Sequence, residues 1–235
     1  MTQRFLCGLL LGLLATVPAL AATPESGADY SAAEKLIFMT EHLAPIQGPT
    51  TLRYAFRRSG SLEKSFDDTV SIHLGARADG GCCTAEGDFL SGGHKLPLPA
   101  LDDAKSNPVI LYFLEHDVRD MQRLTKGQQA HFRKRIRMAI YNGAQVRPAT
   151  FQYRGKPVSG QEIAISPYLD DPSRARFEKL AHKEYVFMMS DAVPGGVYGI
   201  RSRIGDTDPS AVPLMMEEMY IEGAAATPFT ASAIR

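Results

Sequence analysis

The stretch NPVILYFLEHDVRDMQRLTKGQQAHFRKRIRMAIY, residues 107–141, is the long segment of this chain whose apolar residues recur at helical spacing. In its first half they fall at three- and four-residue steps with polar residues between them; they are Leu111, Leu114, Val118, Met121 and Leu124. Gly127 interrupts the pattern, and a second apolar series begins at Phe132. The stretch therefore predicts two successive amphipathic helices, and we expect Leu114, Val118 and Met121 to be buried against the rest of the protein.

Segments on both sides of this stretch alternate apolar and polar residues, a pattern typical of strands that bury one face. They cover residues 51–57, 70–74, 83–90, 149–153, 163–165, 185–189, 197–204 and 214–221, and the last of them fits a strand or a helix. Turn signals such as Asp79-Gly80-Gly81 separate them in hairpin order. Helical patterns cover residues 30–43 and follow Asp170. The predicted fold class is α+β: a curved, mainly antiparallel sheet of about seven or eight strands covered by the central helix pair, with further helices near the N-terminus and before the last hairpin.

The N-terminus has the three parts of a secretory signal peptide. Residues 1–4 supply a basic start, residues 5–15 are an uninterrupted apolar run, and Ala19-Leu20-Ala21 is a small-x-small cleavage site. The run is shorter than the roughly 20 residues that span a bilayer, so we expect cleavage near Ala21 and no transmembrane segment in the mature chain. The predicted organisation is a signal peptide at 1–21, a linker at 22–29, a single α+β domain at 30–222 and a flexible tail at 223–235.

Composition narrows the class of protein. The chain has 26 basic and 26 acidic residues, and this balance argues against a nucleic-acid-binding protein. A signal peptide without a glycosylation sequon favours a bacterial periplasm, or secretion, as the location. The sequence contains no phosphate-binding loop, dinucleotide fingerprint or Gly-x-Ser-x-Gly motif, so it predicts no cofactor.

Cys82 and Cys83 are adjacent, and they are the cysteines that remain after signal cleavage. A bond between neighbouring residues closes a strained ring, so we expect free thiols or intermolecular pairing rather than a disulfide between these two. A metal site is one alternative, because thiolates suit Cu(I) or Zn, although no Cys-x-x-Cys spacing is present and His94 lies beyond a glycine-rich turn. A redox role is the other alternative.

A basic run in the central stretch and a methionine in a late strand are candidate binding residues. The basic run from His131 to Arg137 predicts a ligand or partner surface formed by Arg133, Lys134 and Arg137, which would attract anionic lipid headgroups or an acidic protein; a solvated helix face is the alternative. Met188 is a further candidate, because the Met-, Phe- and Tyr-rich late strands offer flexible side chains for an adaptable apolar cavity.

Glu115-His116-Asp117 has the composition of an acid–base cluster. Consecutive residues of a helix point about 100° apart, so we expect these side chains to form a solvated face rather than a site. A hydrolase with dispersed residues is the alternative function, and it would be favoured if His116, His131 or His182 lay in a cleft beside an acid and a nucleophile.

Three segments, NPVILYFLEHDV at 107–118, FRKRIR at 132–137 and DAVPGG at 191–196, resemble an uncharacterised family of exported bacterial proteins. That family brings no assigned functional residues. A leading helix followed by antiparallel strands with inserted helices is also similar, at the level of the fold, to the periplasmic lipoprotein carriers. The leading hypothesis is an exported, periplasmic, non-enzymatic protein that binds an apolar, lipid-like ligand or a partner protein.

Overall fold

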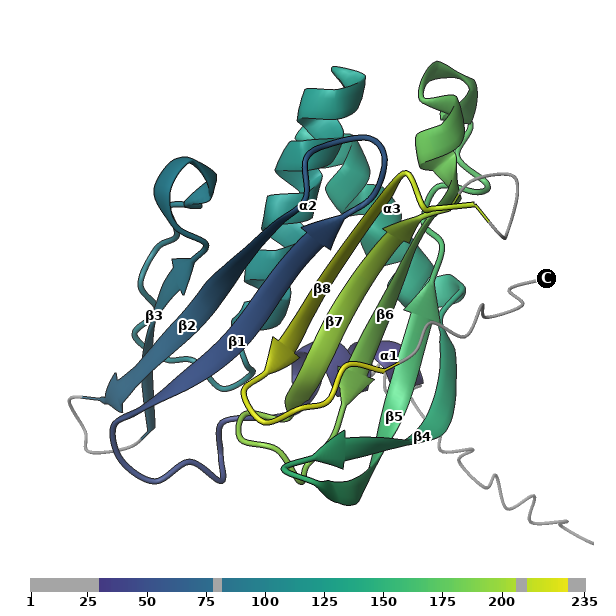
Figure 1. The fold of residues 1–235 in the computed structure, drawn as a ribbon. Coiled ribbons are helices and arrows are strands. Elements are labelled where there is room, and N and C mark those ends of the chain that lie inside the picture. The colour runs from purple at the N-terminus through teal and green to yellow at the C-terminus, as the bar shows by residue number, and fades with distance from the viewer. Residues whose placement is uncertain (1–29, 78–81, 206–210, 228–235) are drawn as a thin grey trace, which may run out of the picture.

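The computed structural model describes residues 30–77, 82–205 and 211–227, and within these ranges eight strands form one open, curved sheet. The strands are β1 (Thr50–Ser59), β2 (Phe66–Ala76), β3 (Cys82–Phe89), β4 (Gln145–Tyr153), β5 (Lys156–Ile165), β6 (Lys183–Met189), β7 (Val197–Ile204) and β8 (Met215–Ile221). Neighbouring strands are antiparallel and follow the order β3-β2-β1-β8-β7-β6-β5-β4 (Figure 1). This confirms the predicted α+β class, and the segment predicted as strand or helix is a strand.

The strand order explains where the helices lie. β3 and β4 are at opposite edges of the sheet, so the chain between them has to cross the whole sheet. It does so through α2 (Val109–Thr125) and α3 (Gln129–Asn142), which lie on one face of the sheet (Figure 1). The predicted helix pair is therefore confirmed, and the hydrophobic core lies between this pair and the sheet.

The buried face of α2 differs in part from the predicted one. Leu114, Val118 and Met121 are buried as expected, with no more than 8% of their surface exposed. Leu111 belongs to the same series in the sequence, yet it is 54% exposed, so that part of the prediction is wrong. The buried face also includes His116 and Asp117, because these polar side chains find charged partners on the sheet.

Leu114→Ala is expected to lower the free energy of unfolding by about 2–3 kcal/mol, because it removes buried methyl groups and leaves a cavity under α2. Leu111→Ala is the matched control, since it makes the same chemical change on the exposed side of the same helix and should cost less than about 0.5 kcal/mol. Urea denaturation of both variants measures the difference, and equal losses would contradict this orientation of α2.

The first helix begins with a capping box formed by Ser31 and Glu34. The Ser31 hydroxyl accepts from the Glu34 backbone N–H at 3.1 Å, and the Glu34 carboxylate accepts from the Ser31 backbone N–H at 2.9 Å. The helix consists of α1 (Ala32–Glu34) and a π-helical turn, η1 (Lys35–Met39). The remaining helical segments are the 3₁₀ turns η2 (Gly92–His94), η3 (Arg174–Arg176) and η4 (Glu178–His182).

The helical segment predicted after Asp170 is present as two short 3₁₀ helices rather than one continuous helix. Glu178, the first residue of the second one, adopts a positive φ of 34°, which lies outside the right-handed helical region. The predicted signal peptide at 1–21, the linker at 22–29 and the Asp79-Gly80-Gly81 turn all lie outside the described residues.

The first part of the predicted tail contacts the sheet, and residues 228–235 lie outside the described ranges. The Tyr198 hydroxyl donates to the backbone oxygen of Ala225 at 2.6 Å, and Arg201 Nη2 donates to that of Thr227 at 2.5 Å. Both donors belong to β7, so residues 225–227 cover that strand. Within the described ranges, no helix has the length and apolar composition needed to cross a membrane.

Candidate functional site

Charged residues occupy positions on the sheet face that the helices cover. Side chains alternate between the two faces of a strand, so the series Tyr54, Phe56 in β1 places Arg58 on the same face. In β8, Glu217 precedes the buried Met219 in the same way. The antiparallel register sets Arg58 directly opposite Glu217. We call these two residues, together with His116 and Asp120 of α2, the buried charge cluster.

Every nitrogen of the Arg58 guanidinium has a partner. Nε donates to Glu217 Oε1 at 2.8 Å, and Nη1 donates to Glu63 Oε2 at 3.0 Å. Nη2 contacts the Asp120 carboxylate and lies 3.0 Å from His116 Nε2. Arg58 is 5% exposed and Glu217 is fully buried, so these are charge-assisted contacts with little screening by water.

His116 lies between a donor and an acceptor. Its Nε2 is 3.1 Å from Glu217 Oε1 and 3.0 Å from Arg58 Nη2. One ring nitrogen cannot donate to the carboxylate and accept from the guanidinium at once, so only one of the two contacts is a hydrogen bond in any protonation state. The expectation of a solvated Glu115-His116-Asp117 face is wrong for His116 and Asp117, which are both buried.

A second buried ion pair lies beside this cluster. Lys183 of β6 pairs with Asp117 of α2, and both side chains are fully buried. The Tyr185 hydroxyl donates to the other oxygen of Asp117 and lies 3.4 Å from the Tyr168 hydroxyl. The α2 helix is thus held to the sheet by two adjacent ionic contacts rather than by apolar packing alone.

The buried carboxyls of Glu217 and Asp117 have opposite pKa shifts. Burial raises the pKa of Glu217, but interactions with His116, Lys183 and Arg58 lower it more, so its pKa is well below the ordinary value. Burial raises the pKa of Asp117, and Lys183 opposes that rise only in part. Glu217 is therefore a stable carboxylate, whereas the charge on Asp117 depends on Lys183.

The buried charge cluster opens into a pocket of about 660 Å³ that we call the β1–α2 pocket. Its lining residues come from β1, β2, the β1–β2 and β3–α2 connections and α2; they are Arg58, Glu63, Lys64, Ser65, Phe66, Gly93, His94, Lys95, Leu96, His116, Arg119, Asp120 and Arg123. Part of the lining is apolar: the Phe66 and His94 rings stack at 4.1 Å, and Leu96 also lines the pocket. Arg123 belongs to the charged part of the lining and holds Glu63 through two hydrogen bonds of 2.5 and 2.8 Å.

His116, Asp120 and Glu217 have the residue types of a metal site, and their possible ligand atoms lie within 4.8 Å of one another. Arg58 Nη2 contacts all three of these residues. A divalent cation would have to displace this guanidinium and leave it buried without partners, which is costly. The three residues fit the arginine cation that already lies among them better than they fit a metal.

The structure brings together three of the four predicted surface residues and places Met188 elsewhere. Arg133, Lys134 and Arg137 lie on the exposed side of α3, and Arg133 forms hydrogen bonds of 2.9 and 3.1 Å with Glu115 of α2. Met188 of β6 has no exposed surface, and its sulfur accepts from the Thr227 hydroxyl at 3.4 Å. The three cations therefore share one face, whereas Met188 lies under the segment that covers the sheet.

All three histidines named for the hydrolase alternative line pockets. His116 lines the β1–α2 pocket with Ser65. His131 lines a pocket of about 550 Å³ with Ser173, and its Nε2 lies 2.6 Å from the buried Asp171. His182 lines a third pocket with Glu178. Imidazoles and acids thus meet, but across the described ranges no serine or threonine hydroxyl forms a hydrogen bond with any of these three imidazoles.

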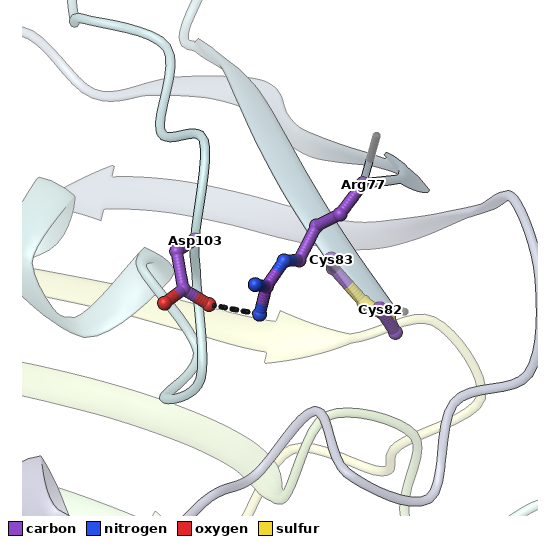
Figure 2. Close-up of a disulfide and its surroundings, with 4 residues drawn as sticks. All are labelled: Arg77, Cys82, Cys83 and Asp103. Atoms are coloured by element: carbon purple, nitrogen blue, oxygen red, sulfur yellow. Dashed lines mark hydrogen bonds and ion pairs between the residues drawn. A yellow bond between two sulfur atoms is a disulfide. The ribbon is translucent and has the colours of Figure 1, made fainter. Parts of the chain in front are cut away.

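Cys82 and Cys83 are joined in a disulfide at the start of β3, near the ion pair of Arg77 with Asp103 (Figure 2). The expectation that adjacent cysteines would not bond to each other is therefore wrong in this structure. Cys83 is fully buried. In the disulfide form neither sulfur is a thiolate, so this form does not provide the metal ligands considered as an alternative.

The fold and the site define an α+β protein with an open antiparallel sheet, a helix pair on one face and charged residues buried between them. No protein family model and no curated protein matches the chain. Among solved structures, the lipoprotein LppX of Mycobacterium tuberculosis is similar over 79% of this chain and 91% of LppX, with 10% sequence identity and a TM-score of 0.30. This is a loose similarity of fold, so the functional argument rests on the geometry of the pocket.

Proposed function

We propose that the protein binds an anionic amphiphile, meaning an apolar chain with a negatively charged head, in the β1–α2 pocket. One observation carries this proposal: a single cavity of about 660 Å³ is lined by both apolar and cationic side chains. Small-molecule sites typically enclose roughly 300–1,000 Å³ and combine apolar lining with a few polar groups that orient the ligand. Phe66 and Leu96 supply the apolar contact for the chain.

The charges around the pocket favour an anionic head. Five cationic side chains line it, against the two carboxylates of Glu63 and Asp120. Both carboxylates are already held by Arg58 and Arg123. Lys64 has no ion pair with any described residue, so its ammonium is free to contact a ligand.

Lys95 is the second cation available to a ligand. Its partner Asp88 is 3.0 Å away, and both side chains are more than half exposed. An exposed pair of this kind is worth little, so a ligand carboxylate or phosphate can replace Asp88 at small cost. The signal-like sequence at 1–21 supports the proposal that such a ligand is met in the periplasm or outside the cell.

Lys64→Met combined with Lys95→Met is expected to raise the Kd for dodecanoate about tenfold, which corresponds to about 1.4 kcal/mol. The Kd for dodecanol, which has the same chain and no charge, is expected to change less than about twofold, since the apolar side chains of Phe66 and Leu96 are unchanged. Isothermal titration calorimetry with both ligands below their aggregation limits measures the two values.

Lys156→Met is the matched control, because Lys156 is exposed at the start of β5, on the other half of the sheet. This variant should bind dodecanoate as the wild type does. Wild-type protein that binds neither ligand, or binds dodecanol as tightly as dodecanoate, would contradict the proposed headgroup preference.

A further inference from the structure

The exposed side of α3 carries a mixed basic and apolar stripe. Lys134, Arg137, Met138 and Tyr141 follow one another at the i, i+3, i+4 and i+7 positions that share one face of a helix. Met138 is 40% exposed and Tyr141 is 53% exposed, so two large apolar side chains stand in solvent next to two cations. The basic run in the sequence predicts the charges of this face. The exposure of Met138 and Tyr141 beside them is seen only in the structure.

The N-terminal helix extends this stripe. The Ser31 hydroxyl donates to the backbone oxygen of Ile140 at 3.3 Å, which brings the start of α1 to the C-terminal end of α3. Tyr30 precedes Ser31 and is 42% exposed, so a second tyrosine lies at the Tyr141 end of the stripe. We call the set Tyr30, Lys134, Arg137, Met138 and Tyr141 the docking face.

The cations of the docking face differ from their neighbours in α3. Arg133 is held by Glu115, and Arg135 donates to the backbone oxygen of Pro167 and lies 3.5 Å from Asp171. By contrast, neither Lys134 nor Arg137 forms an ion pair with any residue in the described part of the chain. The sequence has no net charge, so this local positive charge belongs to the face and not to the whole protein.

We infer that the docking face binds the surface of an anionic bilayer. Lysine and arginine next to a membrane contact the phosphates of acidic lipids, and each contributes about a fivefold gain in binding. Tyrosine and methionine enter the boundary between headgroups and acyl chains, where an aromatic ring with a polar end and a flexible thioether are both accommodated. An acidic protein would satisfy the two cations but would leave the three apolar side chains unexplained.

The inference is independent of the β1–α2 pocket, because the docking face shares no residue with the pocket lining. Co-sedimentation with vesicles of phosphatidylcholine, with and without phosphatidylglycerol, tests it directly. Wild-type protein should bind only the vesicles that contain phosphatidylglycerol, and added salt should weaken this binding.

Two pairs of substitutions separate the contributions. Lys134→Gln with Arg137→Gln should weaken binding to anionic vesicles about 25-fold, because each of the two cations contributes about fivefold. Met138→Ser with Tyr141→Ser should weaken it at every salt concentration, because the apolar contribution is not screened.

Lys126→Gln with Arg176→Gln is the matched control, because it also removes two exposed cations that have no ion pair with a described residue. Thermal unfolding should be the same for all variants, because the substituted side chains are exposed. The inference is overturned if wild-type protein binds neither vesicle or both equally, or if the Lys134 and Arg137 pair behaves like the control pair.

Discussion

Glu217→Ala is expected to lower the free energy of unfolding by about 3–5 kcal/mol, among the largest effects that one substitution in this chain should produce. The Arg58 guanidinium would stay charged and buried while losing the partner of its Nε. Removing one member of a buried ion pair is costly for this reason, even where the intact pair itself contributes little. Urea denaturation at neutral pH measures the loss.

Two controls separate this explanation from a general loss of contacts. Glu162→Ala removes the partner of Arg147 in an ion pair at the surface and should cost less than about 1 kcal/mol. Arg58→Met combined with Glu217→Leu should recover most of the stability, because apolar residues of similar size replace the buried pair, while Glu63 and Asp120 keep Arg123 as their partner. A loss in Glu217→Ala no larger than in Glu162→Ala would contradict the buried charge cluster.

Lys183→Met is expected to have the second large effect, about 3–5 kcal/mol at neutral pH. It leaves the carboxylate of Asp117 fully buried with no cation beside it, although the Tyr185 hydroxyl still donates to it. Asp117→Asn added to this variant should restore part of the stability, because an amide carries no charge to desolvate. Denaturation at several pH values measures both variants.

The pH dependence of this loss follows from the raised pKa of Asp117. Burial already holds this pKa above the ordinary value of 3.8, and the loss of Lys183 raises it further. A carboxyl with a raised folded-state pKa destabilises the fold where it is ionised, so the penalty is full above that pKa and disappears as the pH falls toward 3.8. The deficit of Lys183→Met should therefore be smaller at about pH 5 than at about pH 8. An equal deficit at both would contradict the assignment.

The sequence was sufficient to predict the sheet largely because strands such as β1 and β2 alternate buried and less buried residues. The same alternation contained a signal for the site: extending the Tyr54 and Phe56 series by one step places Arg58 on the buried face. In β8, Glu217 lies two residues before the buried Met219, so the same rule places it on the buried face. The pairing of these two charges depends on the β1–β8 register, which joins residues far apart in the chain and has no local sequence signature.

The prediction for α2 failed at His116 and Asp117 for a related reason. Helical periodicity assigns polar residues to the solvent side, and that rule holds only where the facing element is apolar. Here Glu217 and Lys183 face the helix, so polar residues are buried with partners. The basic face of α3 was predictable from the sequence because none of the described residues covers it. The contact of Ser31 with Ile140, which brings Tyr30 to this face, was not predictable.

A crystal structure of the protein with dodecanoate is the most direct test of the proposed binding site. We expect the acyl chain to pack against Phe66 and Leu96 and the carboxylate to contact Lys64 or Lys95. The buried charge cluster should be unchanged, since its charges already have partners. Dodecanoate bound at another place, with the β1–α2 pocket holding only water at a saturating concentration, would contradict the central claim.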